Sequence, residues 1–152
     1  MMRPHRSYRL LAALALGISL LAPNTPALAA DRNVKLTLDG RPVDRAGGVA
    51  LVRNGVVYAD VVPLVKSFDG LLTFQGNAVV VTIHGITGRF TEGSRTALIN
   101  DGAVTMRGQT FKRNGDWYVP LDTFITQIAK AKVRVNPAQT QADIVVNANP
   151  SS

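Results

Sequence analysis

Six side chains of this 152-residue chain have types that suit the binding of an anionic polymer. Trp117 and Tyr118 are adjacent in a predicted strand, so they point to opposite sides, which allows one of them to be exposed. An exposed aromatic ring can lie against a sugar ring or hold an apolar group of a partner. The alternative is that Trp117 completes the core. Four basic residues lie on or beside two Asn-Gly turns, where they contact either a polymer or only solvent: Arg53, Arg107, Lys112 and Arg113.

Residues for catalysis are scarce. His84 is the only histidine after residue 30, and no serine lies in a motif that activates a nucleophile. Glu92 is the only glutamate, and most aspartates stand at turns or helix starts, where a carboxylate caps the backbone. The chain has no glycine-rich phosphate loop and no calcium loop. The sequence therefore predicts no catalytic residues and no enzymatic activity.

Metal ligands are equally few. A copper site built from imidazole or sulfur needs several such groups. After residue 30 the chain offers one histidine, His84, one methionine, Met106, and no cysteine. We expect no metal and no cofactor.

The first thirty residues have the pattern of a secretory signal peptide. Arg3, Arg6 and Arg9 precede an apolar run from Leu10 to Leu21, and Ala27-Leu28-Ala29 is a cleavage site of small residues. The run is shorter than the roughly 20 residues that span a bilayer, so we expect no stable membrane insertion after cleavage. We predict a signal peptide over residues 1–30 and a secreted, periplasmic or cell-envelope location.

The charge after residue 30 is mildly positive. Three of the 17 basic residues precede residue 31, which leaves 14 basic against 10 acidic residues. This balance favours loose contact with anionic polymers. No segment interleaves aromatic residues with dense arginine and lysine, and an exported protein does not meet nucleic acid, so we expect no nucleic-acid partner.

An internal repeat organises the rest of the chain. Arg53-Asn54-Gly55-Val56-Val57-Tyr58 returns sixty residues later as Arg113-Asn114-Gly115-Asp116-Trp117-Tyr118. Each copy precedes apolar residues at i, i+3, i+4 and i+7, the spacing of one helix face. These residues are Val61, Leu64, Val65 and Phe68 in the first copy and Leu121, Phe124, Ile125 and Ile128 in the second.

Short alternating segments separated by glycine turns predict many strands. Asp60 is expected to cap the first helix, and Pro120 to open a second that continues to about Lys130. The predicted fold class is α+β, with two related units of antiparallel β-hairpins, each packed on one short amphipathic helix. The units span residues 31–84 and 85–147, and residues 148–152 are expected to fray. Strands are expected at residues 34–38, 49–52, 56–58, 71–74, 78–83, 86–90, 96–99, 104–106, 110–112, 117–118, 133–135 and 144–146.

The segment from Asn114 to Leu121, followed by an amphipathic helix and Lys132-Val133-Arg134-Val135, resembles the copper amine oxidase N-terminal-like domain family. These domains are stalk modules of bacterial exported proteins. The segment from Leu36 to Val43 resembles the opening strand and turn of that family, so the resemblance covers residues 31–146. Asp122 departs from it, because the family usually has arginine there. The resemblance implies a non-catalytic accessory module on envelope proteins.

Two functions follow as hypotheses. The first is a secreted, non-catalytic envelope module that binds cell-wall glycan or another anionic surface polymer. The alternative is a protein-interaction or assembly factor, a partner or inhibitor of an exported protein, acting through sheet edges or an apolar patch. Unpaired edge strands also favour a homodimer.

Overall fold

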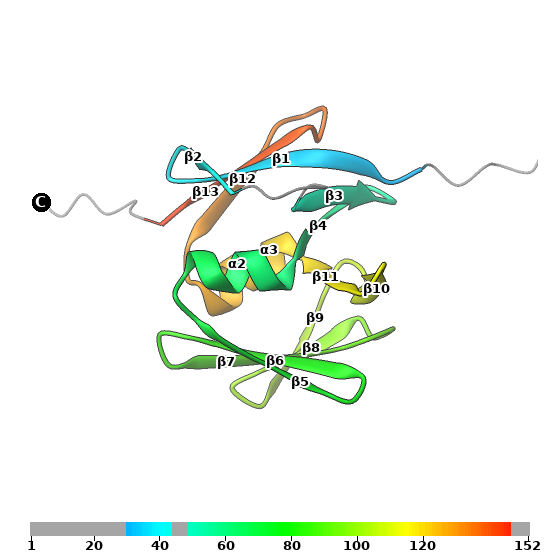
Figure 1. Cartoon of the computed structure of the whole chain (residues 1–152), viewed down its shortest axis with the longest axis vertical. Helices are drawn as coiled ribbons and strands as arrows, with labels where there is room; N and C mark the ends of the chain where they lie inside the picture. The colour runs from blue at the N-terminus through cyan, green and yellow to red at the C-terminus, as the bar shows by residue number, and fades with distance from the viewer. Residues whose placement is uncertain (1–29, 44–48, 147–152) are drawn as a thin grey trace, which may run out of the picture.

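A computed structural model of the chain describes residues 30–43 and 49–146. The predicted signal peptide and the predicted frayed tail therefore lie outside the described residues, apart from Ala30. Within the described part, no helix has the length and apolar character needed to cross a membrane. The chain forms two β-sheets with short helices between them (Figure 1).

The first sheet has eight strands and contains both copies of the repeat. Its strands follow the order β10-β11-β4-β3-β1-β13-β12, and β2 pairs with β1 beside that path. Local hairpins account for β3–β4 and β10–β11, whereas β1 and β13 pair in parallel from opposite ends of the chain. The bounds are β1 (Arg32–Leu38), β2 (Arg41–Pro42), β3 (Ala50–Arg53), β4 (Val56–Asp60), β10 (Phe111–Arg113), β11 (Asp116–Pro120), β12 (Lys132–Val135) and β13 (Gln141–Val145).

The second sheet is a meander of five consecutive antiparallel strands. Each strand pairs with the next, so β5 and β9 form its two edges. The bounds are β5 (Leu71–Gln75), β6 (Ala78–Ile83), β7 (Ile86–Thr91), β8 (Thr96–Ile99) and β9 (Gly102–Thr105).

The first helix, α2 (Val61–Ser67), begins as the sequence predicts. The Asp60 side chain accepts a hydrogen bond of 3.0 Å from the Val62 amide, which satisfies one of the unpaired N–H groups of the first turn. Leu64 and Val65 are fully buried, so the predicted apolar face points into the core. The helix lies between the two sheets (Figure 1).

The second helix is present but differs in form from the prediction. A short α-helical turn, α3 (Leu121–Thr123), leads into a π-helical segment, η2 (Phe124–Ile128). Its wider turn is closed by the Ala129 amide, which donates to the Phe124 carbonyl over 3.1 Å. The predicted apolar residues Phe124, Ile125 and Ile128 remain fully buried, so packing stabilises a turn that local propensity alone does not specify.

The main core fills the space between the sheets and the helices. Phe90 of the second sheet stacks on Phe124 of η2 with ring centroids 6.3 Å apart. Gly88 lies beside Ile128, and a Cβ at Gly88 would stand 2.3 Å from the Ile128 Cδ1 atom. The glycine therefore allows η2 to approach the sheet closely.

The two copies of the repeat meet in the first sheet. β4 and β11 pair antiparallel, with Ala59 opposite Val119, and these residues occupy equivalent positions sixty residues apart. On either side of this pair, Tyr58 stands opposite Pro120 and Asp60 opposite Tyr118. Tyr58 is the repeat equivalent of Tyr118, and Asp60 is the repeat equivalent of Pro120, so exchanging the two copies leaves this set of pairs unchanged. An approximate two-fold axis therefore passes between Ala59 and Val119.

The two predicted units, residues 31–84 and 85–147, contribute strands to both sheets. In the second sheet β6 of the first unit pairs with β7 of the second. In the first sheet β4 of the first unit pairs with β11 of the second, so each repeated hairpin pairs the open edge of the other.

Candidate functional site

A small aromatic cluster lies on the outer face of the first sheet, opposite the face that the helices cover. It consists of two pairs of repeat equivalents, Leu51 with Phe111 and Tyr58 with Tyr118, and all four are buried. The Tyr58 ring meets Phe111 edge-on at 4.8 Å, and Phe111 stacks on Tyr118 at 5.2 Å. The approximate two-fold axis thus brings the same side chains of both copies to one place.

Two arginines cover this cluster and share one carboxylate. The Arg53 guanidinium lies 3.7 Å from the centre of the Phe111 ring, and Arg113 lies 5.3 Å from that of Tyr118. Arg53 Nε and Nη2 donate to Asp31 Oδ1 and Oδ2 over 2.9 and 2.7 Å, and Arg113 Nη1 donates to Oδ2 over 3.1 Å. The Arg53 hydrogen bonds, with the charges of both arginines, hold the pKa of Asp31 below its usual value against the effect of desolvation.

An open groove of about 710 Å³ runs beside this cluster. We call it the arginine groove. Tyr58 and Phe111 contribute the apolar part of its lining, and charged and amide side chains contribute the polar part. Its lining residues are Ala30, Asp31, Arg53, Asn54, Val56, Tyr58, Arg107, Gly108, Gln109 and Phe111.

Gly108 sets the shape of the groove wall. A Cβ atom at Gly108 would stand 2.1 Å from the Tyr58 hydroxyl oxygen, which is closer than any real contact. The glycine therefore lets the loop before β10 cross directly over the tyrosine. Burial raises the pKa of the Tyr58 hydroxyl, although the charges of Arg53 and Arg95 act in the opposite direction.

Arg107 provides the most accessible charge of the groove. Its side chain is 76% exposed, and its Nε atom lies 3.4 Å from Asp122 Oδ2 at the surface. An exposed ion pair of this length constrains the side chain little.

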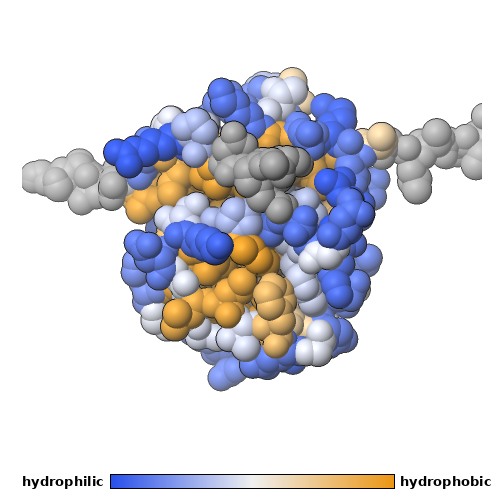
Figure 2. Space-filling view, in the orientation of Figure 1, coloured by the Kyte–Doolittle hydropathy of each residue, from blue (hydrophilic) through white to orange (hydrophobic). Residues whose placement is uncertain are grey.

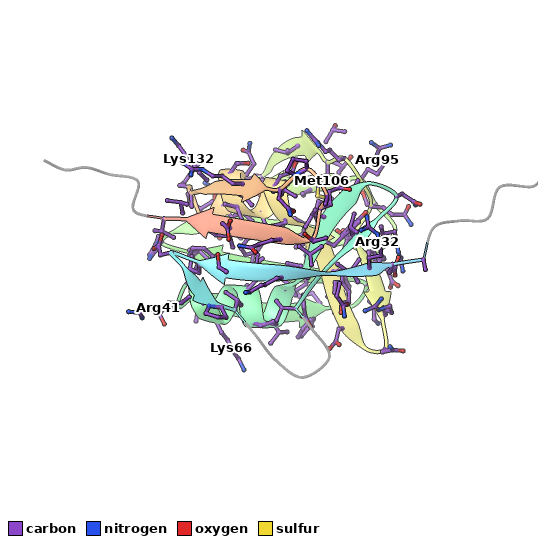
Figure 3. The ribbon with its side chains drawn as sticks, turned by 90° about the horizontal axis from the view of Figure 1, so that it is seen from above. Arg32, Arg41, Lys66, Arg95, Met106 and Lys132 are labelled. Carbon is purple, nitrogen blue, oxygen red and sulfur yellow. The ribbon has the colours of Figure 1, made fainter. Side chains whose placement is uncertain are left out.

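Figure 3 shows Arg32 and Arg95 at one end of the molecule, and Arg41, Lys66 and Lys132 toward the other. The first end is that at which β1 begins.

The structure brings four of the six predicted binding residues together, namely Arg53, Arg107, Arg113 and Tyr118, and it places Lys112 beside Trp117 on the other face. Arg53 and Arg107 line the arginine groove, and Arg113 joins them through Asp31. Lys112 points to the opposite face of β10, where its Nζ lies 5.3 Å from the centre of the Trp117 ring.

Neither Trp117 nor Tyr118 is exposed, so Trp117 follows the alternative that places it in the core. Trp117 is 5% exposed and belongs to the main core, while Tyr118 is 3% exposed and belongs to the outer cluster. The two do point to opposite sides of β11, but both sides of that strand are covered. Stacking of a sugar ring on either aromatic face is therefore unavailable in this conformation.

The sequence analysis missed several groove residues. Asp31, Gly108 and Gln109 stand before the first strand or in the loop before β10, where no local pattern marks them, and Asn54 was recognised only as a turn residue. A signal was nevertheless present, because Phe111 repeats Leu51 at the same sixty-residue offset that relates the two tyrosines. Extending the repeat one strand upstream would have found the cluster.

The described residues show no cluster of metal-binding side chains. His84 occupies a turn with a φ of 48°, and Glu92 is exposed. No three histidine, cysteine, aspartate or glutamate side chains gather within residues 30–43 and 49–146. The donors that these ranges provide therefore do not fit a copper ion.

The described residues form a mostly β domain of two sheets with short helices between them. The family model described as the copper amine oxidase N-terminal domain matches residues 37–144. The chain belongs to this family, as its resemblance predicts, and the family's domain is the non-catalytic N-terminal region of copper amine oxidases. Comparison with curated proteins and with solved structures finds no match.

Proposed function

We propose that this chain is an exported, non-catalytic module of the cell envelope that binds an anionic surface polymer in the arginine groove. The observation that supports the proposal most directly is the joint presence of Arg53 and Arg107 on an open groove with a partly aromatic lining. Arginine suits planar carboxylate and phosphate groups because its N–H donors form a rigid fork.

Asp31 prepares Arg53 for such a ligand. The Asp31 carboxylate accepts hydrogen bonds from Nε and Nη2 of Arg53, and the Arg53 Nη1 group takes no part in that ion pair. Because the guanidinium is already fixed over Phe111, little side-chain entropy is lost when a ligand binds. Arg107 supplies a second, more mobile charge on the same groove.

The other groove residues suit a glycan. The amides of Asn54 and Gln109 can donate and accept hydrogen bonds with sugar hydroxyls. Tyr58 and Phe111 are buried rings that shape the wall of the groove, and the Arg53 guanidinium covers Phe111. A polymer of acidic sugars therefore matches the groove better than a neutral polymer or a polymer that carries only phosphate.

The test measures binding of residues 30–152 to polygalacturonate, with dextran as the neutral polymer of comparable size. We expect binding to polygalacturonate that weakens as salt rises from about 0.05 to 0.3 M, because the salt screens the attraction between the arginines and the carboxylates of the polymer. Arg107→Gln should weaken binding about fivefold, since it removes roughly 1 kcal/mol of exposed charge interaction.

The matched control is Arg41→Gln, which removes the same charge far from the groove (Figure 3). If Arg41→Gln weakens binding as much as Arg107→Gln, net charge rather than the groove binds the polymer. Equal affinity for dextran and polygalacturonate, or no binding of polygalacturonate at 0.05 M salt, would refute the proposal.

A further inference from the structure

The strand β5 forms an open edge of the second sheet. It pairs with β6 through a hairpin whose two-residue turn is Gly76-Asn77, and Gln75 stands opposite Ala78 beside that turn. In such a hairpin the pair next to the turn exchanges both backbone hydrogen bonds, and the bonded pairs then alternate along the strand. Thr73 therefore bonds to β6, while the N–H and C=O groups of Leu72 and Phe74 point away from the sheet.

This edge lacks the charges that protect the edges of the first sheet. β10 carries Lys112 and Arg113, and β12 carries Lys132 and Arg134. Lysine and arginine on an edge strand oppose pairing with another chain. The residues of β5 are Leu-Leu-Thr-Phe-Gln, with no charge, no proline and no glycine.

The edge is also apolar on both faces. Leu71 is 72% exposed and Phe74 is 51% exposed, the two most exposed large apolar side chains in the described part of the chain. Leu72 and Val62 of α2 are partly buried against the main core beside them. Figure 2 shows apolar surface gathered on this side of the molecule, over the region where α2 and β5 lie in Figure 1.

We propose that β5 pairs antiparallel with β5 of a second copy of this chain, about a two-fold axis at Thr73. In this register Leu72 of one copy stands opposite Phe74 of the other, and both pairs exchange their outward N–H and C=O groups. The same register brings the half-exposed Phe74 ring beside a leucine side chain on each side of the axis. It joins the two five-stranded sheets into one continuous sheet.

The strand is its own complement, which favours a second copy as the occupant. About the axis at Thr73, the outward N–H and C=O groups of Leu72 and Phe74 of one copy meet those of the other, so one β5 satisfies the open edge of its twin. β5 carries no charge, so two copies of it pair without like charges facing one another.

The first test compares the sedimentation mass of residues 30–152, which hold every described strand and helix, over about 1 to 200 µM. We expect a concentration-dependent dimer. Thr73 is exposed and lies on the proposed axis, so Thr73→Lys and Thr73→Glu each place like charges opposite one another. Each variant alone should weaken dimerisation at least about tenfold, a cost of about 1.4 kcal/mol, and an equal mixture of the two should restore it.

The matched control is Thr105→Lys on β9, the other edge of the same sheet, where the threonine is also exposed. It should leave the dimer unchanged. A circular dichroism melt of each variant separates loss of the dimer from loss of the fold.

The second test fixes the register. The chain has no cysteine, so Thr73→Cys introduces a single thiol. In an antiparallel pair without hydrogen bonds, facing Cα atoms lie about 4.5 Å apart, within the range that a disulfide bridges. We expect Thr73→Cys to form a disulfide-linked dimer on mild oxidation, and Thr105→Cys to remain largely monomeric.

A monomer throughout the concentration range, a dimer that Thr73→Lys leaves intact, or failure of the mixed charge variants to associate would each overturn the proposal. Capture of an unrelated strand by the wild-type edge without self-association would also overturn it and identify β5 as a site for another protein. The arginine groove lies on the first sheet, so polymer binding and dimerisation can fail independently.

Discussion

Replacing Asp31 by asparagine tests how the arginine groove is held together. The variant keeps the size of the side chain but removes the charge that Arg53 and Arg113 share. Both arginine side chains are 34% exposed and Asp31 is 17% exposed, so solvent screens each interaction. At about 0.5–1 kcal/mol for each pair, the loss is about 1–2 kcal/mol. For a domain of this size that corresponds to a melting temperature lower by about 4–8 °C.

The effect should depend on pH in a defined direction. The pKa of Asp31 is lowered in the folded state, so its proton binds more tightly to the unfolded chain. The stabilisation is therefore fully present above the unfolded pKa of about 3.9 and disappears as pH falls through the folded value. The pKa of Asp143 is also lowered, chiefly by the hydrogen bond that the Thr37 hydroxyl donates to it. Asp143 is present in both wild type and Asp31→Asn, so its contribution to the free energy of unfolding cancels in the difference between them.

The assay is urea unfolding of wild type and Asp31→Asn from pH 2 to 7, followed by circular dichroism. Glu92→Gln is the control, because it removes a negative charge from an exposed position that takes no part in the ion pairs of Asp31. A difference of 1–2 kcal/mol at pH 7 that closes at low pH supports the shared ion pair. The reasoning is refuted if Asp31→Asn matches Glu92→Gln at pH 7, or if the difference between wild type and Asp31→Asn does not shrink between pH 7 and pH 2.

Three further substitutions test the packing and the turns. Ile125→Asp should destabilise the fold by at least about 3 kcal/mol, because an unpaired charge enters a fully buried position; a melting temperature within a degree or two of wild type would contradict this. Gly115→Val should cost about 1–2 kcal/mol in urea unfolding, since the turn holds residue 115 at a φ of 84°, whereas an unchanged midpoint would show that the turn relaxes. Thr110→Val should stabilise the protein by about 1 kcal/mol, because the buried Thr110 hydroxyl has no hydrogen-bond partner within the described residues; a loss of stability would reveal a partner.

The sequence predicted the local part of this fold well. The Asn-Gly turns specify two hairpins because both turn residues adopt positive φ, as Asn54, Gly55, Asn114 and Gly115 do. The carboxylate at Asp60 caps α2 as expected. These features depend on residues a few positions apart, so a single sequence contains the information for them.

The non-local part was not predicted, for the same reason. The parallel pairing of β1 with β13 joins Lys35 to Gln141, and no local pattern indicates that partner. The ion pair between Asp31 and Arg113 also spans most of the chain, so the groove could not be assembled from the arginines alone. The sixty-residue repeat indicated duplication, but it did not show that the copies pair with each other through Ala59 and Val119.

That pairing has a consequence for how the protein folds. β4 pairs locally with β3 but lacks its second neighbour until β11 has been made, so the central sheet closes late and over a long stretch of chain. During this interval an unfolded neighbour offers the same complementary strand, and two chains can exchange their C-terminal halves. Refolding from denaturant should therefore yield exchanged dimers in proportion to protein concentration. Unlike a dimer held by β5, these can separate only by unfolding, so dilution of the native protein would leave them intact.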